Sequence, residues 1–248
     1  MSVHGVPRKG PVLKAAEIMD RLQALGDPER AANLRRYFKT GPGEYAHGDI
    51  FAGLRVPEIR CLAKEYQGLE TAEIKALLRS PIHEARLLAL LIMAEAYNRG
   101  GTRRQERIYR LYLENTRYIN NWDLVDLSAP QIVGAHLANR DKTPLSALAV
   151  SELLWDRRIA IMATFHFIKA HEFGETLRIA EYLLTDTHDL IHKAVGWMLR
   201  EIGKRDRLTE EAFLKRHSTT MPRTMLRYAI ERFPEELRLR YLRGGIMG

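Results

Sequence analysis

The chain has 248 residues, enough for one large domain or two small ones, and its 46% hydrophobic content excludes wholesale disorder. Its 39 Lys and Arg residues outnumber its 31 Asp and Glu residues, so a formal net charge of +8 favours a polyanionic partner such as nucleic acid. Cys61 is the single cysteine, which excludes an intrachain disulfide and a multi-cysteine metal site and fits a reducing cytoplasm.

The start of the chain reads MSVHGVPRKGP and has no apolar core, so it is not expected to act as a secretory signal. Residues 1–10 are predicted to form a flexible basic N-terminal tail. No stretch approaches the roughly 20 apolar residues that a membrane helix needs. The longest apolar run, Leu87–Ala94, is therefore expected to be a buried helix segment.

Helical periodicity dominates the rest of the chain, with no convincing run of alternating strands. Pro28 and Pro57 fall in a first helical turn, where proline is favoured, and the glycine-rich stretch Gly41–Gly53 is predicted to be a loop. The predicted helices are Leu13–Ala24, Pro28–Phe38, Pro57–Tyr66, Thr71–Leu78, Ile82–Asn98, Gln105–Thr116, Trp122–Leu137, Leu145–Leu154, Arg157–His171, Glu175–Leu184, Asp189–Lys204, Glu210–Lys215, Pro222–Phe233 and Glu235–Leu242.

Helices recur at a nearly regular spacing in this pattern. Those that begin near Ile82, Trp122, Arg157, Asp189 and Pro222 are separated by roughly 32 to 40 residues, and each is followed by a second helix. Such pairs stack into a curved solenoid. We therefore predict an all-α helical-repeat solenoid with a concave face, in a single domain over residues 11–248. The alternative is an irregular helical bundle.

Each tryptophan precedes a charged residue by about one helical turn, in the pairs Trp122 with Asp126, Trp155 with Arg158 and Trp197 with Arg200. Residues at this spacing share one face of a helix. A buried core would take the ring without the charge. A surface that receives a cationic base and a phosphate backbone uses both.

Two carboxylates in the segment 121–126 differ in their place along a helix. Asp123 lies at the helix start, where a carboxylate suits the free N–H groups and the dipole. Asp126 lies in mid-helix, where aspartate is a poor helix former and needs another reason. A structural ion pair and a catalytic role are both open for Asp126.

Basic residues gather at several helix ends. Arg157 and Arg158 oppose the dipole of the helix they begin unless a phosphate or a carboxylate compensates them; the alternative is a solvated charge cluster. A later cluster offers either phosphate contacts or ordinary surface charge. Its members are Lys204, Arg205, Arg207, Lys215, Arg216, Arg223 and Arg227.

His188 and His192 have the spacing of a zinc-binding pair, but Asp189 stands where the H-E-x-x-H motif has Glu, and no third ligand is apparent. We predict no metal site and expect these histidines to cap a helix or contact phosphate. Gly196 in mid-helix costs about 1 kcal/mol against Ala, a cost that a close helix–helix or backbone approach there would justify. No Walker loop, G-x-G-x-x-G or nucleophile elbow occurs, so no cofactor is expected.

Together these segments resemble the AlkD family of HEAT-like-repeat DNA glycosylases, over almost the whole chain. The matching pieces are RYFK at 36–39, FAGLRVPE at 51–58, WDLVD at 122–126, WDRR at 155–158 and KAVGWMLRE at 193–201. Any one of the last three alone is weak, but the three together are quite specific.

The resemblance implies excision of N3- and N7-alkylated purines from duplex DNA, read from the backbone side without base flipping. It implies that Asp126 is the catalytic carboxylate and that Trp122 and Trp197 contact the deoxyribose of the damaged nucleotide. Arg158 would bind the backbone phosphate beside the lesion. The remaining DNA-binding residues would be Arg200, Tyr37, Arg157 and Lys193.

One departure from the family pattern lies after Arg158. Better-known members have lysines further along the helix of this arginine, whereas this chain has His166 and Ile168 at those positions, with Lys169 as the substitute. Two other functions are compatible with parts of this pattern. A catalytically silent DNA-binding relative is disfavoured by the presence of Asp126, and a helical-repeat scaffold for protein partners is disfavoured by the basic charge. We expect a monomer with no obligate protein partner and no membrane contact, located in the cytoplasm and nucleoid-associated when bound to DNA.

Overall fold

In the computed structural model, which describes residues 14–244, the chain is all-α, as predicted. Within that range a single isolated β-bridge joins Ile50 to Ile82, and no strand forms. The chain divides into two compact units, and the division falls inside helix α5, between Ile92 and Met93. The single domain over 11–248 stays a prediction, and the tail at 1–10 lies outside the described residues.

Between residues 14 and 92 the first unit holds four helices and the start of a fifth. Their bounds are α1 Ala15–Ala24, α2 Pro28–Tyr37, α3 Val56–Glu65, α4 Thr71–Leu78 and α5 His83–Arg99. Helix α1 packs against α4, and the Glu73 carboxylate of α4 accepts the Ala15 N–H at 2.8 Å. The helix predicted from Leu13 thus begins at Ala15, and Leu13 lies outside the described residues.

The stretch Gly41–Gly53 is a loop, as its glycines predict. Its end is fixed by the buried Glu84 carboxylate, which accepts the backbone N–H groups of Ala52 at 2.9 Å and Gly53 at 2.7 Å. Gly53 has a φ of +91°, and a Cβ there would lie 2.2 Å from the Asp27 carbonyl oxygen. The apolar run Leu87–Ala94 is buried within α5, which confirms the predicted buried segment.

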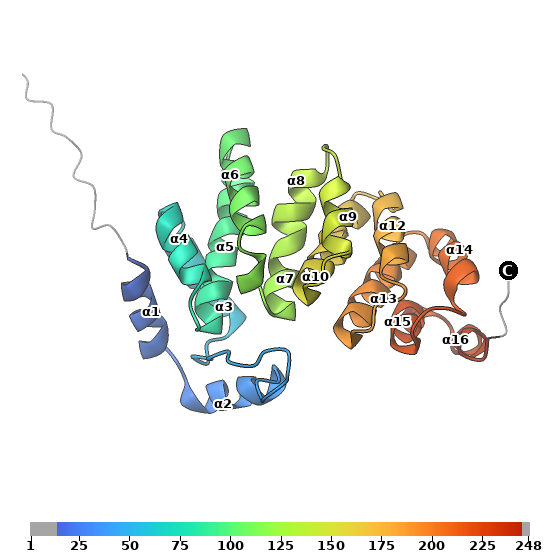
Figure 1. Ribbon diagram of the computed structural model, residues 1–248, viewed down its shortest axis with the longest axis horizontal. Coiled ribbons are helices and arrows are strands. Elements are labelled where there is room, and N and C mark those ends of the chain that lie inside the picture. The colour runs from blue at the N-terminus through green and yellow to red at the C-terminus, as the bar shows by residue number, and fades with distance from the viewer. Residues whose placement is uncertain (1–13, 245–248) are drawn as a thin grey trace, which may run out of the picture. The chain divides into compact units, whose positions relative to one another are not determined.

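The second unit, from residue 93 onward, contains the remaining elements (Figure 1). Their bounds are α6 Thr102–Leu113, η1 Thr116–Tyr118, α7 Trp122–Ala129, η2 Pro130–Gly134, α8 Ala135–Leu137, α9 Thr143–Ala149, α10 Leu154–Ala163, α11 Phe165–Lys169, α12 Gly174–Tyr182, α13 Asp189–Gly203, α14 Arg207–His217, α15 Arg223–Ala229, η3 Ile230–Arg232 and α16 Glu235–Leu242.

Helices α7, α10, α13 and α15 form one layer of this unit, each packed against the next in chain order (Figure 1). They begin at Trp122, Leu154, Asp189 and Arg223, at intervals of 32, 35 and 34 residues. Helices α9, α12 and α14 pack beside them. This order agrees with the predicted succession of helix pairs, whereas the HEAT-like character and the concave face stay predictions.

Two predicted helices are interrupted. The helix predicted over Trp122–Leu137 passes through a π-helical stretch, η2, because Pro130 has no N–H to donate to the preceding turn. The helix predicted over Arg157–His171 breaks at Thr164, whose hydroxyl donates to the Ile161 carbonyl at 2.7 Å. Local hydrogen bonding thus shortens both elements.

The boundary between α9 and α10 also differs from its prediction. Helix α9 ends at Ala149 rather than Leu154, and α10 begins at Leu154 rather than Arg157. The Ser151 hydroxyl between them accepts the Leu153 N–H at 3.1 Å. A serine that competes for backbone N–H groups favours such a turn over a continuing helix.

Candidate active site

Helix α7 begins where its sequence supplies acceptors for free N–H groups. The Asn121 side chain accepts the Trp122 N–H at 2.8 Å, and Asp123 accepts the Leu124 N–H at 2.9 Å. Asp123 is buried, as are Leu124 and Val125. Asp123 therefore has the structural place predicted for it at the helix start.

The Asp126 carboxylate, in the middle of α7, meets the Arg158 guanidinium of α10. Arg158 donates from Nε to Oδ1 at 2.9 Å and from Nη2 to Oδ2 at 2.8 Å. The two side chains are only 11% and 6% exposed. This is a bidentate, largely desolvated ion pair, a geometry that fixes the plane of the carboxylate.

Burial raises the pKa of the Asp126 carboxyl, and the charge and hydrogen bonds of Arg158 oppose that rise without cancelling it. Arg158 has a further partner, because its Nη1 donates to the Leu190 carbonyl of α13 at 2.6 Å. One arginine thus joins the three successive helices α7, α10 and α13.

Arg157 is also compensated by a carboxylate. Its Nε donates to Asp186 at 2.6 Å, and its Nη1 donates to the Ser151 and Glu152 carbonyls. Each of these adjacent arginines therefore has a carboxylate partner, which compensates its charge at the start of the helix. The predicted contacts of Arg157 and Arg158 with phosphate stay predictions.

Helix α13 carries three of the predicted residues. Trp197 is half-buried, its ring centroid lies 6.3 Å from that of Phe165, and its Nε1 donates to Glu201 at 3.2 Å. Arg200 forms an ion pair with Glu231. Lys193 is paired with Asp189 at 2.6 Å and is partly exposed.

The glycine of this helix lies at a close contact. A Cβ at Gly196 would lie 2.4 Å from the Met225 carbonyl oxygen and 3.1 Å from the Ala229 nitrogen. Both atoms belong to the backbone of α15. The close helix approach predicted from Gly196 is confirmed.

His188 caps α13, since its Nδ1 accepts the Leu190 N–H at 3.1 Å. His192 contacts the Asp186 carbonyl through Nε2. These histidines were expected to cap a helix or to contact phosphate, and His188 is a helix cap. In residues 14–244 no group of three or more His, Cys, Asp or Glu side chains is arranged to hold a metal ion.

Tyr37 lies in the other unit, at the end of α2, and is 65% exposed. Its ring meets that of Phe38 edge-on, with centroids 5.1 Å apart. The binding role expected of Tyr37 stays a prediction. Among the site residues predicted from the sequence, Asp126 and Arg158 are joined by two hydrogen bonds.

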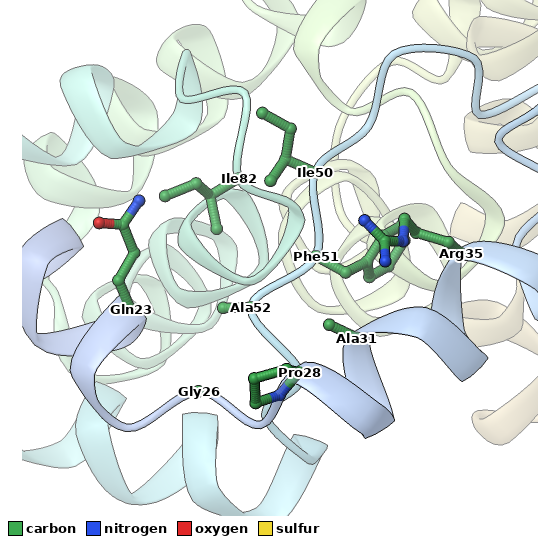
Figure 2. Close-up of a pocket in the computed structure, with 9 residues that line it drawn as sticks. All are labelled: Gln23, Gly26, Pro28, Ala31, Arg35, Ile50, Phe51, Ala52 and Ile82. Carbon is green, nitrogen blue, oxygen red and sulfur yellow. The ribbon is translucent and has the colours of Figure 1, made fainter.

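The first unit also contains a pocket of about 320 Å³, shown in Figure 2. Its wall is mostly apolar, with Arg35 at one side. Residues that line it are Gln23, Gly26, Pro28, Ala31, Arg35, Ile50, Phe51, Ala52 and Ile82. It contains none of the residues predicted from the sequence to act in catalysis or binding.

The acidic partners of the site were missed by the sequence reasoning. Glu201 stands one turn after Trp197 and was detectable by that spacing. Asp186 and Glu231 come from other elements, and only tertiary packing brings them to Arg157 and Arg200. In the later basic cluster, Lys204 and Arg205 pair with Glu201, and Arg207 pairs with Glu211.

Comparisons with known proteins identify the family. The sequence model described as "DNA alkylation repair enzyme" matches residues 18–233. A solved structure described as a predicted DNA alkylation repair enzyme from Enterococcus faecalis has 21% sequence identity and a TM-score of 0.66, over 85% of this chain and 97% of that chain. That likeness shows a shared fold. The comparison with curated proteins gives no match.

No helix within the described range is both long and apolar enough to cross a membrane. The family match spans most of the chain and includes Asp126, Arg158 and both tryptophans of the predicted site. The resemblance noted in the sequence is thereby confirmed at the level of the family. The chain belongs to the family of DNA alkylation repair enzymes.

Proposed function

We propose that the protein is a DNA glycosylase that hydrolyses the N-glycosidic bond of N3- and N7-alkylated purines, such as 3-methyladenine and 7-methylguanine, in duplex DNA. This reaction would initiate base excision repair. The observation that carries the proposal is the Asp126 carboxylate, held bidentately by Arg158 in a family that repairs alkylated DNA.

The chemistry of the substrate suits a single carboxylate. An N-alkylated purine is already cationic, so it leaves as a neutral base with the electron pair of the broken bond, and no general acid is needed. Positive charge then develops on the sugar, as in other glycosidic cleavages. Water adds to the sugar carbon and gives its proton to the solvent.

Asp126 would stabilise that developing positive charge and orient the attacking water. Its low exposure strengthens the electrostatic effect, because a desolvated charge is screened less than one in water. Arg158 keeps the carboxylate plane fixed, so little reorganisation is needed during the reaction. The contact of Arg158 with a backbone phosphate remains part of the proposal beside this positioning role.

The tryptophans would flank the same sugar. Trp122 is half-buried one turn before Asp126 on α7, and Trp197 is half-buried on α13. The face of an indole ring stabilises a nearby cation by about 0.5–2 kcal/mol. Lys193, Arg200 and, in the other unit, Tyr37 would also contact the DNA.

We further propose that the base stays in the duplex and is recognised from the backbone side, on a concave face of stacked helix pairs. The protein would act as a monomer in the cytoplasm, on nucleoid DNA. A catalytically silent DNA-binding relative is the alternative, and it would bind methylated DNA without releasing a base.

The deciding experiment measures release of 7-methylguanine and 3-methyladenine from methylated duplex DNA by the wild type and by Asp126→Asn. We expect release by the wild type and loss of most of it in Asp126→Asn, with DNA affinity retained, because the substitution removes the charge and keeps the side-chain volume. Equal release by both proteins would exclude Asp126 as the catalytic group. DNA binding without release by either would favour the silent relative.

A further inference from the structure

Glu201 is a nearly buried carboxylate whose oxygens are each engaged. It lies one turn after Trp197 on α13 and is 7% exposed. Its Oε1 accepts the Trp197 indole N–H at 3.2 Å and a hydrogen bond from Lys204. Its Oε2 accepts a hydrogen bond from Arg205 Nη1 at 3.1 Å.

Packing alone does not explain a carboxylate at this position. Its neighbours Leu199 and Ile202 on the same helix are fully buried, and an apolar side chain would avoid the cost of desolvating a charge. Burial opposes ionisation of Glu201, but the hydrogen bonds from Lys204, Arg205 and Trp197 outweigh it and lower the pKa. Glu201 is therefore held as an anion.

This anion fixes one edge of the Trp197 ring. An indole has a single N–H donor, so the hydrogen bond to Glu201 selects one orientation of the ring about its side-chain torsions. On another side stands Phe165, with ring centroids 6.3 Å apart. Phe165 is itself flanked by Lys169 Nζ at 5.2 Å and by the Arg205 guanidinium at 6.0 Å.

Arg205 joins the two restraints, because it binds both Glu201 and the Phe165 ring. It also donates to the Glu201 carbonyl at 2.8 Å, which fixes the guanidinium relative to α13. The ring of the half-buried Trp197 is thus held at its N–H edge and against Phe165 by side chains that themselves have defined positions.

We propose that Glu201 is a positioning residue for Trp197, which holds the indole in the orientation that excision requires. The inference rests on the proposed function, in which Trp197 contacts the deoxyribose of the damaged nucleotide. Glu201 does not touch the substrate in this scheme. It acts only through the ring that it orients.

The test compares wild type, Glu201→Gln and Glu201→Leu in two measurements. The first is the ¹H–¹⁵N spectrum of the indole N–H groups, in which the three tryptophans give separate signals and Trp197→Phe identifies the one at 197. The second is the single-turnover rate of base release together with the Kd for the same DNA. Glu210→Gln removes another buried acid, on the neighbouring α14, and is the control for the Trp197 signal.

We expect Glu201→Leu to move the Trp197 signal alone and to slow base release by about 10-fold or more, since small misplacements of a contacting group are costly. Its Kd for DNA should change far less. Glu201→Gln keeps an oxygen acceptor for the indole N–H and should stay within about 3-fold of the wild-type rate. In a Trp197→Phe background, the same Glu201 substitutions should have no further effect on the rate.

Two results would overturn the inference. One is a wild-type rate in folded Glu201→Leu, and the other is a loss of rate in Glu201→Leu that is equally large in the Trp197→Phe background. If Glu201→Leu does not fold, a loss of rate in Glu201→Gln that is equally large in the Trp197→Phe background overturns the inference instead. A wild type that binds methylated DNA and releases no base would overturn the proposed function, and with it the role of Glu201 in excision. The indole spectra distinguish these cases, because they report the Glu201–Trp197 hydrogen bond without any reaction.

Discussion

At the scale of single residues, the central feature is a carboxylate that is both shielded and paired. Asp126 keeps its charge next to Arg158 while burial pushes its pKa upward. Removing one partner of such a pair leaves an uncompensated buried charge, which typically costs about 3–5 kcal/mol. Loss of activity in an Arg158 variant would therefore include the effect of a displaced Asp126, beside the loss of the proposed phosphate contact.

The raised pKa of Asp126 predicts how excision depends on pH. The proposed reaction needs the ionised carboxylate, so the rate should fall as the pH falls through the pKa of Asp126, at a pH above the ordinary value of 3.8. The measurement is the single-turnover rate against pH at saturating enzyme. The rate that remains in Asp126→Asn should lack this acid limb, and the same limb in both proteins would contradict the assignment.

Glu210 predicts a pH dependence of stability. It is almost fully buried in α14, its Oε1 has no hydrogen-bond partner within the described residues, and burial raises its pKa to about 8. The folded state therefore keeps the proton to a higher pH than the unfolded state. The free energy of unfolding should fall by up to about 1.4 kcal/mol per pH unit from about pH 4.5 to about pH 8, and then level off.

Urea unfolding of wild type and Glu210→Gln across this pH range tests the point. The amide cannot ionise, so Glu210→Gln should show a shallower decline and gain stability relative to the wild type as the pH rises. Glu211→Gln removes the adjacent, more accessible carboxylate and is the matched control. Parallel curves for wild type and Glu210→Gln would show that Glu210 does not ionise as inferred.

At the scale of elements, the packing of α13 on α15 depends on the absence of a side chain at Gly196. The atoms that a Cβ would meet are the Met225 carbonyl oxygen, the Ala229 nitrogen and the Tyr228 Cβ of α15, and none of them can rotate away. Helix α13 also carries Trp197, Arg200 and the carbonyl that binds Arg158. Its position therefore controls several residues of the candidate site together.

We predict that Gly196→Ala destabilises the protein by about 1–3 kcal/mol, because overpacking forces the two helices apart. Gly174, at the start of α12, is the matched control, since a Cβ there would meet nothing within 4 Å. Gly174→Ala should stabilise the fold by about 0.4–1 kcal/mol through the entropy of the unfolded chain. Chemical unfolding measures both, and a Gly196→Ala variant as stable as Gly174→Ala would refute the close approach.

At the scale of the whole molecule, the net charge of +8 predicts salt-dependent binding to DNA. Many of the cations near the candidate site are paired with carboxylates, among them Arg157, Arg158 and Arg200. Some of the positive charge is thus already compensated within the protein. The remaining accessible cations would set the number of counterions that DNA binding releases.

Lys193→Ala tests this at one position of α13. If Lys193 contacts a phosphate, the slope of log Kobs against log salt concentration should become shallower by about 1. Arg110→Ala removes an exposed cation of α6 and should leave the slope unchanged. An unchanged slope in Lys193→Ala would mean that this side chain does not touch phosphate, and a flat slope in the wild type would favour a protein-binding scaffold.

The amino-acid order alone predicts the all-α class, most helices to within a few residues, the close approach at Gly196 and the family. These depend on local signals, namely periodicity, capping residues, a glycine with no local reason and short motifs. Helices α4 and α16 have their predicted bounds because both are short, uninterrupted and flanked by clear turns. The π stretch that begins at Pro130 was not predicted, because a proline inside a helical pattern indicates a break without specifying how the helix continues.

The pairing of the charges in the site follows from the packing of helices that are distant in the sequence. Sequence spacing placed Asp126 beside Trp122 on one helix, but its partner Arg158 lies 32 residues away, and only the packing of α10 on α7 joins them. The same holds for Arg157 with Asp186 and for Arg200 with Glu231. An ion pair between elements has no sequence period, because its geometry is set by how whole helices pack and how much water they exclude.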